Sequence, residues 1–175
     1  VAVVGATGLV GRTMIQVLTE REFPVTDLRL LASGRSAGRT TSVNGRTYDN
    51  AEARPDAFDG IDIDTFSAGA DVPRELAPLA TARGATVIDN SSAWRKDPEV
   101  PLVVSEVNPA DLDDIPKGIV ANPNCTTMAA MPVLGPLHER AGLRRLHVAS
   151  YQAVSGSGGA GIQELDTQLR GGYAA

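Results

Sequence analysis

The hydrophobic positions of this chain fall into short runs that are separated by longer amphipathic stretches. A β-branched or alternating run of this length is typical of a strand that is buried in a sheet. Such runs predict strands at residues 1–4, 28–32, 40–43, 46–48, 61–66, 85–88, 102–104, 118–121 and 146–149. Asn44-Gly45 lies between two of them, which is a strong signal for a hairpin turn.

Amphipathic stretches follow several of these strands and predict helices. The first helix has apolar residues at helical spacing, namely Val10, Met14, Val17 and Leu18. A second helix is expected from Asp71, as a possible N-cap, to a stop at Gly84. A third helical stretch opens at Met128. Residues 51–60 are acidic and interrupted by Pro55, and we expect a loop there.

The alternation of strands and helices predicts an α/β fold with a mostly parallel, Rossmann-like sheet and right-handed crossovers. In such sheets the ligand lies at the carboxyl ends of the strands. The Gly5 loop, residues 67–69, residues 90–95 and Cys125 all follow predicted strands. We therefore expect these segments to meet in one crevice.

A glycine-rich loop joins the first strand to the first helix. Its sequence is Gly5-Ala6-Thr7-Gly8-Leu9-Val10-Gly11. This unit seats the pyrophosphate of a dinucleotide on a helix N-terminus, and its glycines allow the backbone to approach the phosphates. The Gly-x-x-Gly-x-x-Gly spacing is unspecific, because short-chain reductases and epimerases also use it. A turn without a ligand is the alternative.

The loop after the second strand indicates which dinucleotide is bound. NAD-binding chains usually place a carboxylate there for the ribose 2′-hydroxyl. Residues 33–39 contain no carboxylate but do contain Arg35 and Ser36, which are suited to a 2′-phosphate. This favours NADP, although a solvated loop is the simpler alternative and fits Arg39.

Cys125 is the only cysteine of the 175 residues. It follows the apolar run 118–121 and precedes a helical stretch, which places it at a strand-to-helix turn. The positive end of the helix dipole favours the thiolate, which is the nucleophilic form. A small buried hydrophobic residue is the alternative.

Composition excludes several other classes of function. A net charge of -5 argues against non-specific binding of nucleic acid, and no apolar run approaches the length of a membrane span. One cysteine cannot form a disulfide within the chain, which fits a reducing cytoplasm. Cys125 with the two histidines, His138 and His147, gives no metal-ligand cluster, so we expect no metal.

Several segments together resemble the bacterial aspartate-semialdehyde dehydrogenases. They occur in family order along the chain, at residues 5–11, 32–36, 66–69, 87–95, 122–127 and 150–158. The glycine loop is common to many families. The combination of the segments around Arg95, Cys125 and Gln152 is much more specific.

The resemblance implies a role for each matching residue. Cys125 would be the nucleophile that forms an acyl-thioester, and Arg95 would bind the phosphate. Asn124 would help to position the phosphate and the acyl group, and Gln152 would orient the acyl-enzyme. The residues implied to contact NADP are Gly5, Thr7, Gly8, Leu9, Val10, Gly11, Arg35, Ser36, Ser155 and Gly156.

The implied reaction is the NADP-dependent reductive dephosphorylation of aspartyl phosphate to aspartate semialdehyde. It would belong to the biosynthesis of lysine (through diaminopimelate), methionine and threonine, in a cytoplasmic homodimer or tetramer whose partners are the small-molecule substrate and phosphate. Other acyl reductases, of the N-acetyl-glutamyl-phosphate reductase or malonyl-CoA reductase type, stay open. A non-catalytic nucleotide-binding module also stays open. A short-chain reductase is disfavoured, because Tyr151 has Ser155 where that class needs lysine.

Length is the one departure from the family. Its members carry a second half with a catalytic histidine, and neither His138 nor His147 fits that role. We expect a fragment in which residues 1–124 form the NADP-binding domain. Residues 125–175 would then open an α+β catalytic and dimerisation domain. Such a fragment is expected to be inactive by itself.

Overall fold

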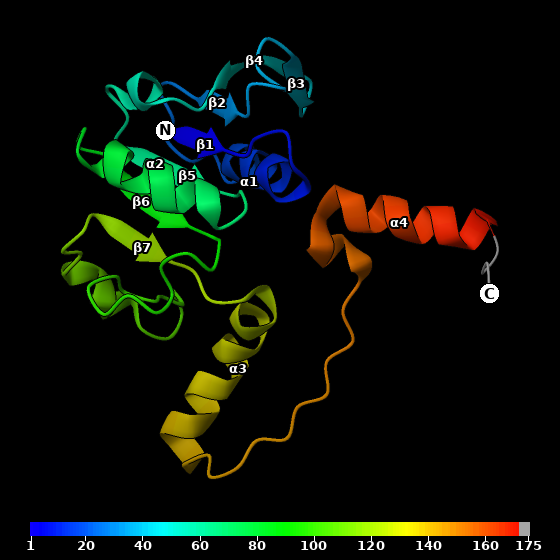
Figure 1. The fold of residues 1–175 in the computed structure, drawn as a ribbon. Helices are drawn as coiled ribbons and strands as arrows, with labels where there is room; N and C mark the ends of the chain where they lie inside the picture. The colour runs from blue at the N-terminus through cyan, green and yellow to red at the C-terminus, as the bar shows by residue number, and fades with distance from the viewer. Residues whose placement is uncertain (172–175) are drawn as a thin grey trace. The chain divides into compact units, whose positions relative to one another are not determined.

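A seven-stranded sheet organises the first part of the chain in this computed structural model, which describes residues 1–171 (Figure 1). The strands lie in the order β3-β4-β2-β1-β5-β6-β7. All neighbouring strands run parallel except β3 and β4, which form the predicted hairpin. The strands are β1 (Ala2–Val4), β2 (Arg29–Ala32), β3 (Thr40–Val43), β4 (Arg46–Glu52), β5 (Ile63–Phe66), β6 (Thr86–Asp89) and β7 (Ile119–Ala121). The mostly parallel sheet predicted from the sequence is thereby confirmed.

Helices cover both faces of this sheet. Helix α1 (Leu9–Glu20) lies on one face, where Ile15 packs against Val3 of β1 and Leu30 of β2. Helix α2 (Asp71–Thr81) lies on the other face, over a larger cluster that contains Val4 and Phe66. Successive strand residues point to opposite faces, so the apolar runs of β1 and β2 supply both cores at once.

Two further helices follow the sheet. Helix α3 (Cys125–Ala141) follows β7 after a connection of residues 122–124, and it begins three residues earlier than the predicted start at Met128. Helix α4 (Gly158–Gly171) follows a short 3-10 helix, Val154–Ser157. None of the helices in the described range is long and apolar enough to cross a bilayer.

Four further sequence-based expectations about the elements are corrected. Asp71 is the first residue of α2 rather than its N-cap, which is Ala70. Residues 102–104 form only an isolated bridge between Leu102 and Ala121. Residues 51–60 are not all loop, because β4 extends to Glu52 and a 3-10 helix spans Pro55–Phe58. Proline suits the start of that helix, where its missing N–H is not needed, and buried Phe58 anchors it.

The fourth correction concerns residues 146–149, which have no regular secondary structure. Their pattern suits a strand, but Val148 is 74% exposed and no strand among the described residues pairs with the segment. A strand needs a neighbour for its backbone groups. The segment belongs to a second unit, which starts at Leu146, whereas the first unit is Val1–Arg145. The functional boundary predicted at residue 124 stays a prediction.

Candidate active site

The glycine loop crosses the carboxyl end of β1 in close contact with its neighbours. The backbone nitrogens of Gly5 and Ala6 donate to the carbonyl of Leu31 at 2.9 and 3.2 Å. Gly5 has a φ of +83°, and a Cβ at this position would collide with the carbonyl oxygen of Ser67. Only glycine fits both restrictions. The loop is therefore fixed between the ends of β2 and β5.

The start of α1 is open to a ligand. Its N-cap is Gly8, which has no side chain to bond the first N–H groups of the helix. Leu9 and Val10 follow in the first turn and are 44% and 46% exposed. The first N–H groups of a helix have no partner within it and carry its positive dipole end. This helix start is suited to a phosphate group.

A cavity of about 390 Å³ lies beside this loop at the carboxyl ends of the strands. It is lined by Val4, Gly5, Thr7, Gly8, Ala32, Ser33, Ala53, Ser67, Ala68, Val72, Glu75 and Leu76. The walls of this cavity are formed by the backbone of the glycine loop and by small side chains, some of which carry hydroxyl groups. They leave room for a flat, phosphorylated molecule. The residues present thus fit the adenosine and pyrophosphate parts of a dinucleotide.

The loop after β2 forms a tight turn at the rim of this cavity. The backbone N–H of Ser36 donates to the carbonyl of Ser33 at 2.8 Å, and Arg35 is exposed between them. A carboxylate also reaches this turn, from Glu52 at the end of β4. Sequence reasoning missed Glu52, because the pairing of β2 with β4 brings it there from a distant part of the chain.

The segment after β6 is shaped by a buried carboxylate. Asp89 is fully buried, and it accepts hydrogen bonds from the backbone N–H and the hydroxyl of Ser91 at 2.9 and 2.8 Å. Burial raises the pKa of Asp89, while the two bonds from Ser91 and the charge of Arg95 act in the opposite direction. The Ser91 hydroxyl oxygen in turn accepts from the N–H of Ala93 at 3.0 Å. These bonds turn the chain back toward Arg95.

Arg95 is held by two backbone carbonyls. Its Nε donates to the carbonyl of Asn122 at 2.8 Å, and its Nη2 donates to that of Asn90 at 3.1 Å. A guanidinium has five N–H donors, so several remain for an anion. Asn122 lies in the segment that leads to Cys125. The structure therefore joins two of the segments that the sequence singled out.

Cys125 is the first residue of α3 and its side chain is exposed, so the alternative of a buried hydrophobic residue is wrong. Asn124 is the N-cap, and its Oδ1 accepts from the backbone N–H and the hydroxyl of Thr126 at 3.0 and 2.7 Å. The Cys125 sulfur lies 3.8 Å from the same oxygen. Asn124 thus fixes the start of the helix that carries the thiol, a structural role that sequence reasoning missed.

The remaining predicted site residues lie in the second unit. Gln152 precedes the 3-10 helix, and Ser155 and Gly156 lie within it. All three are exposed. A Cβ on Gly156 would collide with the amide nitrogen of Gln152, so these two residues pack together. Within residues 1–171, no group of three histidine, cysteine or acidic side chains is placed to hold a metal ion.

The sheet, the glycine loop and the cavity define a Rossmann-type, dinucleotide-binding domain. Within that class the chain belongs to the semialdehyde dehydrogenase family. Residues 1–115 match the NAD binding domain of semialdehyde dehydrogenases, and residues 134–174 match their dimerisation domain. The fold and family expected from the sequence are confirmed.

Known proteins of this family are similar along the whole chain. The aspartate-semialdehyde dehydrogenase of Streptomyces akiyoshiensis is 63% identical over 170 residues, which cover 97% of this chain and 49% of that protein. The crystal structure of aspartate semialdehyde dehydrogenase II from Vibrio cholerae, complexed with ASA, has a TM-score of 0.93 at 45% identity and covers 99% of this chain and 53% of that one.

An NADP-containing structure is more distant. The aspartate semialdehyde dehydrogenase from Candida albicans with NADP has a TM-score of 0.68 at 28% identity, over 81% of this chain and 47% of that one. The chain thus spans about half the length of the curated relatives it matches.

Proposed function

We propose that this chain is part of an NADP-dependent aspartate-semialdehyde dehydrogenase that works through an acyl-thioester on Cys125. One observation carries the proposal. Arg95, whose guanidinium is suited to phosphate, donates a hydrogen bond to the carbonyl of Asn122, in the segment that leads to Cys125 at the Asn124-capped start of α3. A cation and a thiol at the start of a helix suit a reaction in which an acyl phosphate loses its phosphate to a sulfur nucleophile.

The thiol chemistry proceeds in two stages. The Cys125 thiolate attacks the acyl carbon of aspartyl phosphate, the C–S bond forms, and the C–O bond to the leaving phosphate breaks. Arg95 binds that phosphate through its remaining N–H donors. The N–H groups at the start of α3 stabilise the oxyanion of the tetrahedral intermediate. Reduction of the thioester carbon then allows the C–S bond to break, which releases the aldehyde and restores the thiolate.

The cofactor cavity serves the second stage. NADPH, when bound, would supply the hydride and leave as NADP. The start of α1 and the loop from Gly5 to Gly11 would hold the pyrophosphate, and Arg35 and Ser36 would hold the 2′-phosphate. By the family resemblance, Ser155 and Gly156 would contact the nucleotide, and Gln152 would orient the acyl group.

We assign residues 1–124 to cofactor binding and residues 125–175 to the beginning of the catalytic and dimerisation domain. The match to a dimerisation domain supports a homodimer or tetramer as the working assembly. We place this enzyme in the cytoplasm, in the biosynthesis of lysine, methionine and threonine.

The test is an assay of the intact protein in the reverse direction. NADP reduction is followed with aspartate semialdehyde and phosphate, with phosphate omitted in a parallel reaction. We expect phosphate-dependent turnover that Cys125→Ser abolishes while NADPH binding persists. Turnover with N-acetylglutamate semialdehyde and phosphate, or with malonate semialdehyde and coenzyme A, instead would assign a related acyl reductase. Nucleotide binding without any turnover would indicate a non-catalytic module.

A further inference from the structure

Glu52 stands beside the loop that we assign to the ribose of the cofactor. Strands β2 and β4 run parallel with Ala32 opposite Glu52, so their carboxyl ends lie side by side. A Cβ built on Gly34 would lie 2.8 Å from Oε1 of Glu52. The carboxylate therefore lies against the loop backbone between Ser33 and Arg35.

Both segments that flank this contact reach the cavity. Ser33, from the loop, and Ala53, next to Glu52, line it. The side chains of Arg35 and Glu52 are exposed, and within residues 1–171 neither makes a hydrogen bond or an ion pair. Opposite charges thus lie on and beside the loop that we assign to the ribose, and neither is paired within the described residues.

We propose that Glu52 is a specificity-determining residue that limits the preference for NADP over NAD, an inference that rests on the proposed function. A carboxylate accepts hydrogen bonds from a ribose 2′-hydroxyl and repels a 2′-phosphate. Arg35 acts in the opposite sense. In NAD-binding domains such a carboxylate follows the second strand itself, whereas here the adjacent strand β4 supplies it.

The experiment titrates the intact protein with NADPH and with NADH, by cofactor fluorescence, in the wild type and in Glu52→Gln. We expect NADPH to bind more tightly and NADH more weakly in the variant. The ratio of the two affinities should shift about tenfold toward NADPH, which corresponds to about 1.4 kcal/mol. The ratio of the affinities for 2′,5′-ADP and 5′-AMP should shift in the same direction. These two probes differ only in the 2′-phosphate, and they lack the nicotinamide.

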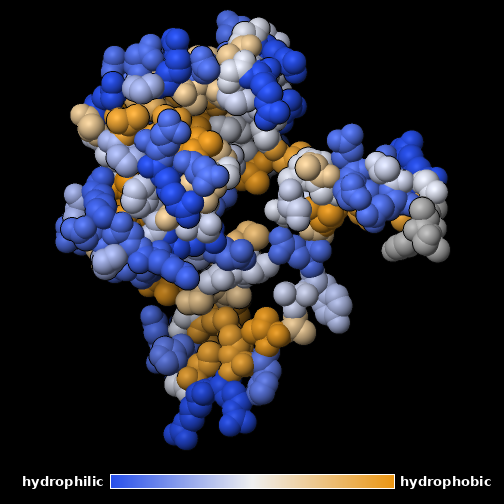
Figure 2. Space-filling view, in the orientation of Figure 1, coloured by the Kyte–Doolittle hydropathy of each residue, from blue (hydrophilic) through white to orange (hydrophobic). Residues whose placement is uncertain are grey.

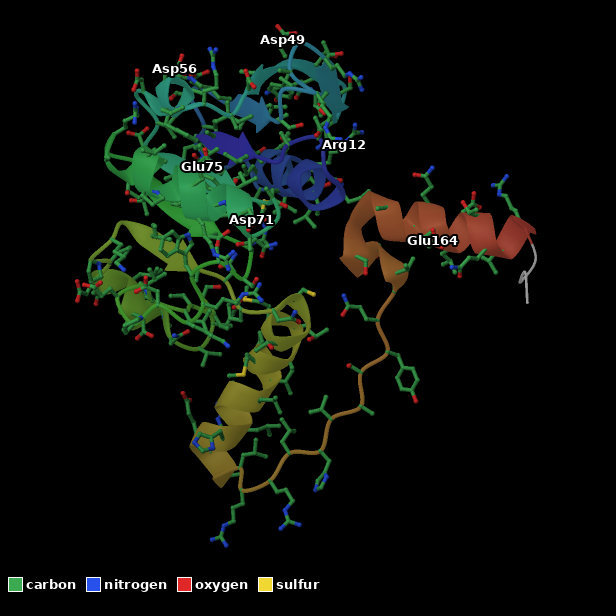
Figure 3. All side chains as sticks on the ribbon, in the orientation of Figure 1. Arg12, Asp49, Asp56, Asp71, Glu75 and Glu164 are labelled. Carbon is green, nitrogen blue, oxygen red and sulfur yellow. The ribbon has the colours of Figure 1, made fainter. Side chains whose placement is uncertain are left out.

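Two further variants test the location of the effect. Gly34→Ala places a methyl group against the carboxylate and should displace it, so the ratio should shift in the same direction as in Glu52→Gln. Glu75→Gln removes the same charge from the α2 side of the cavity (Figure 3) and should change the ratio much less.

The outcomes separate this inference from the proposed function. Wild-type protein that binds neither NADPH nor NADH contradicts the proposed function. If both bind, a ratio that changes by less than about twofold in Glu52→Gln contradicts only the role of Glu52. Weaker NADPH binding in Glu52→Gln, or an equal shift in Glu75→Gln, would also overturn it.

Discussion

The Nε of Arg95 donates to the carbonyl oxygen of Asn122 at 2.8 Å, across the carboxyl ends of β6 and β7. This bond ties the turn after Asp89 to the segment that carries Asn124 and Cys125. It explains why a long, half-exposed side chain has a defined position at the site. A cation that is held in this way needs little further ordering to bind phosphate.

Arg95→Lys should lower phosphate-dependent turnover substantially, even though lysine retains the positive charge. Lysine keeps the charge but cannot bond two carbonyls and grip a phosphate with a planar fork. We expect a loss in kcat/KM of about 2–3 kcal/mol, mostly as a raised KM for phosphate. Steady-state kinetics with varied phosphate measure it. Unchanged KM for phosphate, with normal NADPH binding, would contradict the role of Arg95.

Arg35→Ala should weaken NADP binding by about 1–3 kcal/mol, the scale of a charge-assisted contact, and leave NAD binding almost unchanged. The matched control is Arg39→Ala, which removes an exposed arginine of the same loop. Calorimetric titration of both cofactors against wild type and variants is the measurement. Equal losses for NADP and NAD in Arg35→Ala would refute a 2′-phosphate contact.

Asn124 has a capping role that can be separated from a role in the reaction. Asn124→Ala removes the oxygen that caps α3, and it should lower the free energy of unfolding by about 1 kcal/mol. Asn124→Ser keeps a capping oxygen and should restore most of that stability. If Asn124 also positions the substrate, the serine variant should remain poor in turnover. Full activity in Asn124→Ser would show that Asn124 only caps the helix and does not position the substrate.

Asp64 on β5 should make stability depend on pH. It is fully buried, neither of its carboxylate oxygens has a hydrogen-bond partner, and burial raises its pKa from 3.8 to about 7. The positive charge of the N-terminal amine and the Thr65 N–H both act to lower this pKa, although the Thr65 N–H lies outside hydrogen-bonding geometry. Between pH 3.8 and about pH 7, Asp64 keeps its proton in the folded protein but has lost it in the unfolded chain. The contribution of Asp64 to the free energy of unfolding is therefore complete below pH 3.8, and it is lost as the pH rises to about 7.

The loss amounts to roughly 1.4 kcal/mol per pH unit and about 4 kcal/mol in total. Asp64→Asn should remove this slope, whereas Asp62→Asn, at an exposed position of the same segment, should retain it. Urea unfolding between pH 4 and pH 8, about the range where Asp64 titrates, gives the measurement. A slope that persists in Asp64→Asn would assign it to other groups.

Residues 1–175 alone should bind NADPH but not sustain turnover. Reduction of a thioester needs a proton donor for the emerging alkoxide, and His138 lies in the last turn of α3, away from the Cys125 end. The exposed apolar side chains of α3 include Val133 and Leu137, and Figure 2 shows a hydrophobic patch over this helix. We expect self-association through that patch. Robust turnover by residues 1–175 would show that they contain the missing acid.

The sequence by itself determined the sheet, the glycine loop and the identity of the candidate chemical groups. The apolar runs 1–4 and 118–121 were correctly predicted as strands. A parallel strand is buried on both faces, so its sequence is a continuous apolar run that can be recognised without knowledge of its neighbours. Thr7, Arg35, Arg95 and Cys125 could be predicted as site residues because their neighbours in sequence carry the signal, and their roles stay predictions. The same local reasoning was wrong for residues 146–149, where a strand-like pattern has no strand beside it.

Only the tertiary structure decided which distant groups meet. The pairing of β4 with β2 brings Glu52 to Gly34, and the return of the chain after β6 brings Arg95 to Asn122. It also buries Asp64 without a hydrogen-bond partner, in a run whose alternation predicted no more than a strand. Strand order and register depend on contacts far apart in the chain, so the local pattern of apolar residues cannot encode them.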